Sequence, residues 1–329
     1  MNMRRLGPGM LGLVLFLASS VAAATATRWP EPGRSIQAVI PAQAGSGIGN
    51  SVARLVLDAL SAQLGSRIVL QHYTSSNSLP GPPGSVEANT EGYTLLFASV
   101  DTLVIEPGLN RSPAHEPREA FASIGLVAES PHILIVNNDL PVHSVRELTD
   151  YIGKYPGVVH FGSSGNGSTL HLAGEAYLSA TGTNMVHVPY SAAEPATNNL
   201  VNGDIQAMFQ VISGVLNYVR TDKVRALAVM APERSPALPD VPSIAEAGYP
   251  LLTATRWYAL LAPRGTPEAI VERYNAALNE VLESPELRER LLELGATPMG
   301  GTPRDLDRVL ASETEKWGAV IEEAHLQPR

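Results

Sequence analysis

The hydrophobic pattern of this chain alternates between short apolar runs and stretches with a helical period. Between Ser51 and Leu64 apolar side chains recur at helical spacing and Gly65 follows as a stop, which predicts a helix. Short apolar runs predict buried strands at 36–40, 68–70, 94–98, 124–128, 133–137, 158–161, 185–188, 207–210 and 225–230. This alternation is typical of an α/β protein with mostly parallel sheets flanked by helices.

Several helix starts are marked by hydroxyl residues. Ser144 with Glu147 forms a capping-box pair that predicts a helix over 145–155, and Ser243 with Glu246 repeats the pairing. In the C-terminal third the hydroxyl–proline pairs at 266–267, 284–285 and 302–303 each predict an N-cap followed by proline at the first helical position. We therefore expect a helical, charged C-terminal tail.

Two apolar runs lead into loops of glycine, serine and alanine that open a helix. We call residues 41–50, PAQAGSGIGN, the first glycine loop and residues 162–169, GSSGNGST, the second glycine loop. A helix start leaves backbone N–H groups unpaired and carries the positive end of the helix dipole, so either loop could bind a carboxylate or phosphate without a basic side chain. Two such loops predict a ligand held from two sides.

Residues 1–26 have the pattern of a secretory signal peptide. Arg4 and Arg5 precede an apolar run at 10–21, and small residues then offer cleavage near Ala24 or Ala26. An uncleaved anchor is the alternative, but the run is short for a bilayer, and no later segment is apolar over the roughly 18 residues that a span needs. We expect a soluble mature protein in the periplasm.

Composition narrows the classes of protein further. The 329-residue chain is long enough for two domains, and its lack of cysteine excludes disulfides, thiolate metal sites and lipid attachment through cysteine. The net charge is −9 and becomes more negative without Arg4 and Arg5, which argues against nucleic-acid binding.

Enzymatic motifs are weak. The second glycine loop has the glycine spacing of a P-loop, but Ser168 stands where the lysine belongs. His171 and Glu175 lie four apart on one predicted helix face, as metal ligands can, although packing or hydrogen bonding is the simpler interpretation. We expect no cofactor and no metal. Two alternatives stay open. One is an exported hydrolase with a serine nucleophile, testable at Ser168. The other is a cytoplasmic effector domain of a transcription regulator.

Longer motifs carry a family resemblance. Residues 91–99, 167–175, 186–190, 224–250 and 257–282 together resemble the Bug-type receptors of tripartite tricarboxylate transporters, in the right order and over nearly the whole mature chain. The resemblance implies a two-lobed clamshell, or Venus flytrap, of the type II periplasmic-binding class. It places lobe one at 27–133 plus 256–329 and lobe two at 134–255.

The resemblance also implies a binding site between the lobes. The two glycine loops would face each other, so a ligand that touches both would favour the closed state. At Arg256 the family often has a small polar residue; we hypothesise that Arg256 gives a charge-assisted contact to a second carboxylate, and the alternative is a surface arginine stacked on Trp257. The expected ligand-binding residues are Gln43, Ala44, Gly45, Ser46, Gly47, Ser99, Asp101, Ser163, Ser164, Asn166, Ser168, Thr169, Tyr190, Gln210 and Arg256.

Departures from the family pattern bear on which class of ligand this protein binds. Ser46 interrupts a glycine pair, Asn50 and Gln210 replace aspartates, and Ser191 replaces a common lysine. The loss of a charged side chain at Gln210 and at Ser191 favours a plain carboxylate over a zwitterionic amino acid as ligand. The prolines at 79–84 should also shorten or delay a family helix. We expect a monomeric receptor that delivers a dicarboxylate, tricarboxylate or aromatic carboxylate to membrane transporter subunits or to a signalling partner.

Overall fold

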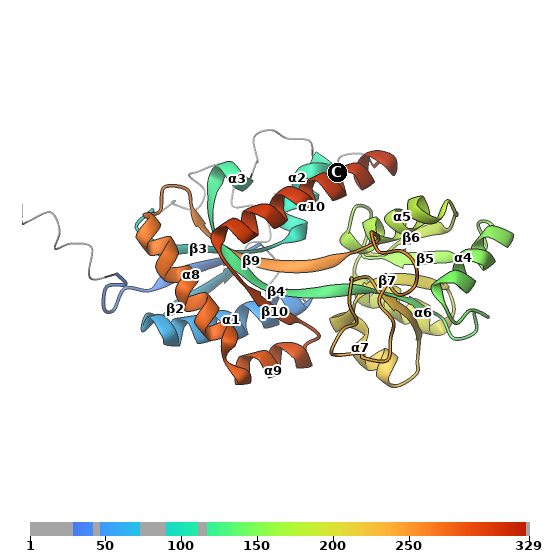
Figure 1. Cartoon of the computed structure of the whole chain (residues 1–329), viewed down its shortest axis with the longest axis horizontal. Coiled ribbons are helices and arrows are strands. Elements are labelled where there is room, and N and C mark those ends of the chain that lie inside the picture. The colour runs from blue at the N-terminus through green and yellow to red at the C-terminus, as the bar shows by residue number, and fades with distance from the viewer. Residues whose placement is uncertain (1–28, 42–46, 73–89, 111–116, 327–329) are drawn as a thin grey trace, which may run out of the picture.

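The computed structural model describes residues 29–41, 47–72, 90–110 and 117–326, and Figure 1 shows them as two lobes side by side. The predicted signal peptide and the proline-rich segment 79–84 lie outside these residues. Strands and helices alternate as the hydrophobic pattern predicted, and the two-lobed α/β fold with a helical C-terminal tail is confirmed.

The strands lie in both lobes and the helices cover them (Figure 1). The strands are β1 (Ile36–Ile40), β2 (Ile68–His72), β3 (Thr94–Ser99), β4 (Phe121–Val136), β5 (His160–Ser163), β6 (Val186–Pro189), β7 (Ala207–Val211), β8 (Arg225–Val229), β9 (Thr255–Pro263) and β10 (Thr297–Gly300). The helices are α1 (Gly47–Leu64), α2 (Glu106–Asn110), α3 (Pro117–Ala120), α4 (Val145–Lys154), α5 (Thr169–Thr181), α6 (Ala193–Asn202), α7 (Ile212–Arg220), α8 (Glu268–Glu283), α9 (Pro285–Glu293) and α10 (Pro303–Glu323), and a π-helical turn, η1 (Asp101–Ile105), joins β3 to α2.

The strands hydrogen-bond in the order β2-β1-β3-β9-β4-β7-β5-β6. Pairing is parallel at both ends of this order, within β2-β1-β3 in lobe one and within β7-β5-β6 in lobe two. β4 and β9 pair antiparallel with each other and with their other neighbours, and β8 and β10 also pair antiparallel with β4. Two parallel sheets are therefore joined through antiparallel strands.

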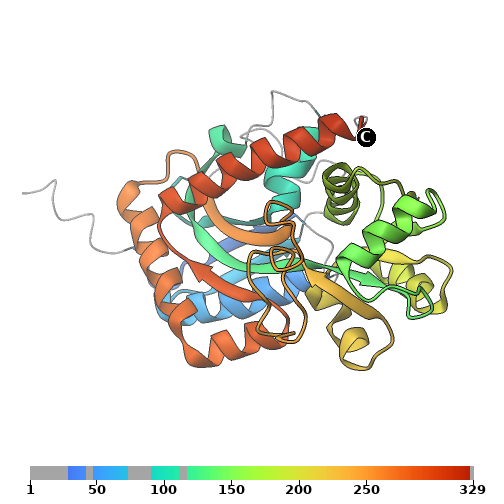
Figure 2. The same cartoon turned by 45° about the vertical axis from the view of Figure 1, so that its right-hand side comes forward.

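β4 and β9 carry the chain between the lobes (Figures 1 and 2). The first part of β4 pairs with β9 and β10, whereas its last residues pair with β7 and β8. Pro131 lies inside β4 opposite Thr255, so the two strands predicted at 124–128 and 133–137 form one element. We keep as a proposal the division into 27–133 plus 256–329 and 134–255, whose borders fall within these strands.

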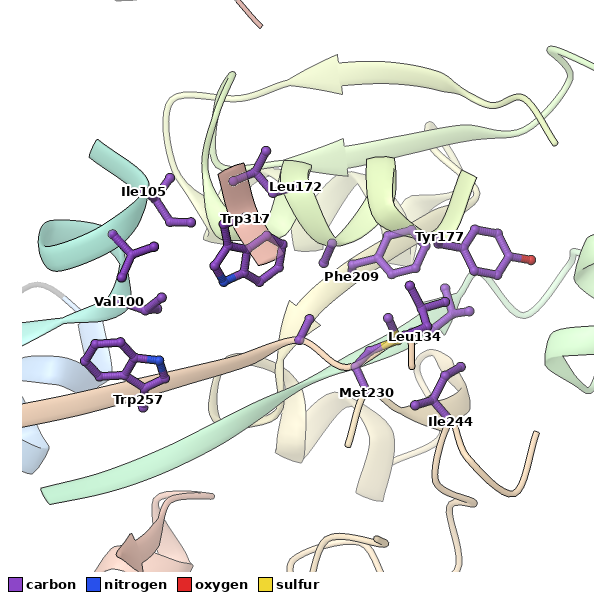
Figure 3. Packing of buried hydrophobic residues seen from close by; sticks show 14 of the residues in the cluster. Val100, Ile105, Leu134, Leu172, Tyr177, Phe209, Met230, Ile244, Trp257 and Trp317 are labelled. Atoms are coloured by element: carbon purple, nitrogen blue, oxygen red, sulfur yellow. The ribbon is translucent and has the colours of Figure 1, made fainter. Parts of the chain in front are cut away.

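One hydrophobic cluster extends through both lobes beneath α10. Trp317 of α10 is 1% exposed and lies between Val100 and Ile105 of lobe one and Leu172 and Phe209 of lobe two (Figure 3). Large aromatic side chains contribute much of the free energy of burial. The lobes are therefore held together along this side. Among the described residues, no helix combines the length and the apolar character that a bilayer crossing needs.

The predicted starts of the C-terminal helices are confirmed in part. α10 begins as expected, with Thr302 as N-cap and a full capping box to Asp305, and α9 begins at Pro285. The prediction was wrong by one residue at α8, where Pro267 is the N-cap. The hydroxyl of the preceding residue, Thr266, donates to the carbonyl of Pro263 at 2.8 Å, so it is engaged in the preceding turn and does not cap α8.

The two predicted serine–glutamate boxes behave differently. Ser144 caps α4 by accepting the N–H of Glu147, but the Glu147 carboxylate accepts from the N–H of His143, one residue earlier than a capping box requires. Ser243 and Glu246 make both hydrogen bonds of a box, yet they close a turn and not a helix. The same hydrogen-bonding pattern thus closes turns as well as helices.

Candidate functional site

A cavity of about 320 Å³ lies at the carboxyl ends of the parallel strands β1 and β3. Ligands of open α/β sheets bind at this edge, and the volume suits a small molecule. The first turn of α1, the π-helical turn η1 and β9 complete the walls. The lining residues are Ile40, Pro41, Ile48, Gly49, Asn50, Phe97, Ala98, Ser99, Asp101, Thr102, Glu106, Arg256 and Tyr258.

Arg256 connects the two lobes at this pocket. Its Nε lies 3.0 Å from Oδ2 of Asp101. Its Nη2 donates to Oδ1 of Asp101 at 3.2 Å and to Oγ1 of Thr169 at 3.1 Å. Asp101 follows β3 in lobe one, whereas Thr169 begins α5 in lobe two. One guanidinium therefore spans the gap between the lobes, and Ser99 supports it by donating to Oδ2 of Asp101 at 3.3 Å.

The charge of Arg256 is firmly held. Burial alone would lower the pKa of the guanidinium, but the Asp101 carboxylate outweighs this effect, and the net shift is upward. Asp101 lies in the π-helical turn η1, a geometry that is frequent at functional sites. Trp257, the neighbour of Arg256 on β9, points into the core and donates to Glu313 at 3.4 Å. Arg256 thus lies in the pocket with its charge directed at Asp101.

The second glycine loop is shaped by its own serines. Ser163, at the end of β5, is fully buried; its hydroxyl donates to the carbonyl of Gly165 at 3.0 Å and accepts from the N–H of Gly165 at 3.1 Å. Ser168 is the N-cap of α5, accepts from the N–H of His171 at 3.3 Å and donates to the carbonyl of Gly165 at 2.8 Å. Ser164 is half-buried and Asn166 exposed. No residue of this loop is among the lining residues of the pocket, and Thr169 is linked to it by accepting the hydrogen bond from Arg256.

Two stacked histidines support this loop from inside lobe two. Nδ1 of His171 accepts from the N–H of Gly167 at 3.0 Å, so its Nε2 carries the proton and donates to Glu175 at 3.1 Å. The rings of His171 and His187 stack with centroids 3.7 Å apart. Burial and the neighbouring His171 lower the pKa of His187 to about 4. Within the described ranges, no three acidic or histidine side chains form a group able to bind a metal ion.

The geometry does not favour a serine nucleophile. The Ser168 hydroxyl is engaged by the backbone at both of its hydrogen bonds. Ser163 does lie 2.7 Å from Nε2 of His187, a serine–histidine contact, but its hydroxyl is fully buried and donates to Gly165. Neither hydroxyl is presented to a ligand in the manner that acyl transfer requires.

Two further expected residues lie away from the described pocket lining. Gln210 is 3% exposed; it donates to Oγ1 of Thr197 at 3.3 Å and accepts from the N–H of Val211 at 2.8 Å. Tyr190 follows β6, and its hydroxyl accepts from Asn199 at 2.8 Å. Both side chains make hydrogen bonds within lobe two.

Half of the first glycine loop, residues 42–46, lies outside the described residues. This applies to Gln43, Ala44, Gly45 and Ser46, whereas Gly47 is the first residue of α1. Their role therefore stays a prediction. Of the described residues of this loop, Pro41, Ile48, Gly49 and Asn50 line the pocket.

Some lining residues were not expected from the sequence. Tyr258 belongs to an apolar run and Glu106 to a short helix, so neither stood out. The available signal was strand alternation: residues two apart on a strand share a face, so Tyr258 should lie on the face of Arg256. That spacing predicts a polar pair on β9 facing the pocket.

The chain matches a known protein family over most of its length. The family model described as tripartite tricarboxylate transporter family receptor matches residues 52–326. Protein BugT of Bordetella pertussis is 31% identical over 325 residues, covering 98% of each chain.

Solved structures agree with this match. An R. palustris protein with adipate is 30% identical with a TM-score of 0.77, covering 91% of this chain and 100% of that one. MatC from Rhodopseudomonas palustris with bound malate is 28% identical with a TM-score of 0.73, covering 88% and 99%. The periplasmic binding protein BugD is 27% identical with a TM-score of 0.72, covering 91% and 100%.

Proposed function

Because this chain belongs to the TctC family of tripartite tricarboxylate transporter receptors, we propose that it captures a small organic carboxylate between its lobes and delivers it to the membrane subunits of such a transporter. The family consists of solute-binding receptors and not of enzymes. Adipate and malate are bound by structural relatives and make dicarboxylates the first candidates here.

The observation that carries the proposal is the contact of Arg256 with both lobes. Its guanidinium lines the pocket, pairs with Asp101 of lobe one and donates to Thr169 of lobe two. A ligand carboxylate beside this cation would interact with both lobes at once and favour their closure. The first turn of α1 opens onto the same pocket and would add backbone donors.

Binding is tested by a thermal-shift screen of organic acids followed by calorimetry. The panel would hold adipate, malate, citrate, benzoate and the zwitterion aspartate. We expect one or more plain carboxylates to raise the Tm, because a ligand that binds only the folded state stabilises it. Small-angle scattering should show a more compact particle with the same acid. A panel without any stabilising carboxylate would contradict the proposal, and aspartate as the best ligand would contradict the preference for plain carboxylates.

We also propose the cellular setting. The chain has the fold of periplasmic binding proteins, and the signal-like residues 1–26 support export with cleavage near Ala24 or Ala26 and without a lipid anchor. A monomer is the simplest form for a receptor that must dock on a membrane complex. Fractionation of cells and N-terminal sequencing of the mature protein test the export, and light scattering tests the oligomeric state.

A further inference from the structure

Tyr258 forms a rigid part of the pocket wall. It lies on β9 two residues after Arg256 and is 3% exposed. Its ring stacks on Phe97, with centroids 5.6 Å apart and planes inclined by 22°, and Phe97 lines the same cavity. Aromatic stacking of this kind fixes the direction of the ring. The hydroxyl is therefore held in one place before any ligand arrives.

The hydroxyl faces the start of α1. A Cβ placed on Gly49, in the first turn of that helix, would lie 3.1 Å from Cε1 of Tyr258 and 3.6 Å from its hydroxyl oxygen. The absence of a side chain at Gly49 thus lets the tyrosine lie against the end of the helix where backbone N–H groups are unpaired. Tyr258, Arg256 and this helix start all border one cavity.

The proton of this hydroxyl has no acceptor within the described part of the chain. Arg256 is its charged neighbour, but a guanidinium only donates hydrogen bonds and cannot accept the phenolic proton. Burial raises the pKa of Tyr258 to about 12, so the hydroxyl keeps its proton at physiological pH. A buried donor without an acceptor destabilises a fold, and such groups in native proteins usually have a functional reason.

We propose that Tyr258 is a ligand-binding residue whose hydroxyl donates a hydrogen bond to an acceptor oxygen of the bound acid. The proposal rests on the carboxylate-binding function proposed above and deepens it. The hydroxyl, the Arg256 cation and the N–H groups of α1 are all donors, so the group that satisfies them together is an anionic oxygen pair such as a carboxylate. The rigid hydroxyl then selects ligands that place such a group against β9.

The test compares Tyr258→Phe with wild type by calorimetry, with adipate and malate as the probes. Loss of one hydrogen bond to a charged group should weaken Kd by about 10-fold or more. The Tm without ligand should stay the same or rise, because phenylalanine keeps the stacking on Phe97 and removes the buried donor. The control is Tyr274→Phe. Tyr274 is also buried, but its hydroxyl donates to the carbonyl of Gly92 at 2.7 Å, so this variant should lose Tm and keep its Kd.

The outcomes separate this proposal from the function it rests on. A wild-type protein that binds adipate or malate, together with an equal Kd for Tyr258→Phe, would overturn the role of Tyr258 alone. A fall in the Tm of Tyr258→Phe like that of Tyr274→Phe would also overturn it, because the hydroxyl would then have its acceptor within the protein. A wild-type protein that binds neither these acids nor any other of the panel would overturn the proposed function, and the role of Tyr258 with it.

Discussion

The two glycine loops have similar sequences but different surroundings: Pro41, Ile48, Gly49 and Asn50 of the first line the pocket, whereas no residue of the second is among the lining residues. In the second glycine loop, Ser163 and Ser168 donate to the carbonyl of Gly165, and the N–H of Gly167 donates to His171 of α5. Around the first loop, Arg256 pairs with Asp101, the Tyr258 hydroxyl has no acceptor among the described residues, and both side chains border the cavity. A strand that leads into a glycine-rich helix start can therefore have its polar groups hydrogen-bonded internally, or it can form part of a binding surface. The side chains around it decide between the two.

The largest loss of ligand affinity is expected for Arg256→Ala, which tests whether the surroundings of the first glycine loop bind the ligand. It would leave the Asp101 carboxylate in the pocket without its cation, where it repels a carboxylate ligand, and it would remove the donor to Thr169. We expect Kd for the best acid of the panel to weaken by about 100-fold. The control Arg234→Ala removes an exposed ion pair with Glu246 and should change Kd little. Full affinity in Arg256→Ala would contradict the site.

A smaller effect should follow from Gly49→Ala. The new methyl group would press on the Tyr258 ring at 3.1 Å and displace its hydroxyl. We expect about a 5- to 10-fold loss of affinity, somewhat less than the loss of a whole charged hydrogen bond. Gly153→Ala in α4 is the matched control, because a Cβ there meets nothing within 4 Å. It should keep Kd and gain about 0.5–1 kcal/mol of stability from helix propensity. Equal Kd values for the two alanine variants would show that the Tyr258 ring can give way.

Acid should weaken lobe two through His187. The folded-state pKa is lowered to about 4, first by burial and then by His171, from an ordinary value of 6.5. Between these values the unfolded chain binds a proton that the folded chain excludes, so the free energy of unfolding falls as pH drops from 6.5 towards 4 and this group adds no loss below that. Urea unfolding at pH 7, 5.5 and 4 would show a smaller fall for His187→Gln than for wild type. Exposed His143→Gln is the control, and equal slopes for all three proteins would contradict the prediction.

The smallest effect on ligand binding is expected in the second glycine loop, whose serines are hydrogen-bonded internally. Ser168→Ala removes the N-cap of α5 and should cost about 1 kcal/mol of stability with Kd nearly unchanged, whereas Ser168→Asn should retain most of the cap. Thermal unfolding and calorimetry check both variants. Labelling of wild type by a serine-reactive phosphonate, lost in Ser168→Ala, would instead support a nucleophile and contradict this interpretation.

Much of the fold followed from local signals. The helical period over 51–64 and the short apolar runs predict which segments are helices and which are strands. Residues close in sequence decide which face of such a segment is apolar and becomes buried. The continuity of β4 did not follow. Two separate strands were predicted at 124–128 and 133–137, because the apolar pattern is interrupted between them, where Pro131 cannot donate to a strand ladder. The structure instead places Pro131 at the crossing between the lobes, which depends on a partner strand far along the chain.

The site was predictable to a lesser degree. Ser99, Asp101, Thr169 and Arg256, which we expected to share the ligand site, are linked to one another by hydrogen bonds, and their role in binding stays a prediction. Tyr258 was missed because an aromatic residue in an apolar strand has the pattern of core, and only the stacking on Phe97 and the opening at Gly49 direct its hydroxyl to the cavity. Strand alternation places Tyr258 on the same face as Arg256, but the direction of its hydroxyl depends on these tertiary contacts, which have no local signal in the sequence.

The path of β9 has a consequence for the order of folding. Leu96 of β3 pairs with Leu261 of β9, so lobe one is incomplete until a distant strand returns to it, whereas the residues of lobe two are contiguous. Contacts between distant residues form late, because closing a long loop costs chain entropy. Once formed, lobe two would itself shorten that loop. Pulse-labelled hydrogen exchange should therefore show β5 and β7 protected before β3; simultaneous protection would indicate that the two lobes condense as one unit.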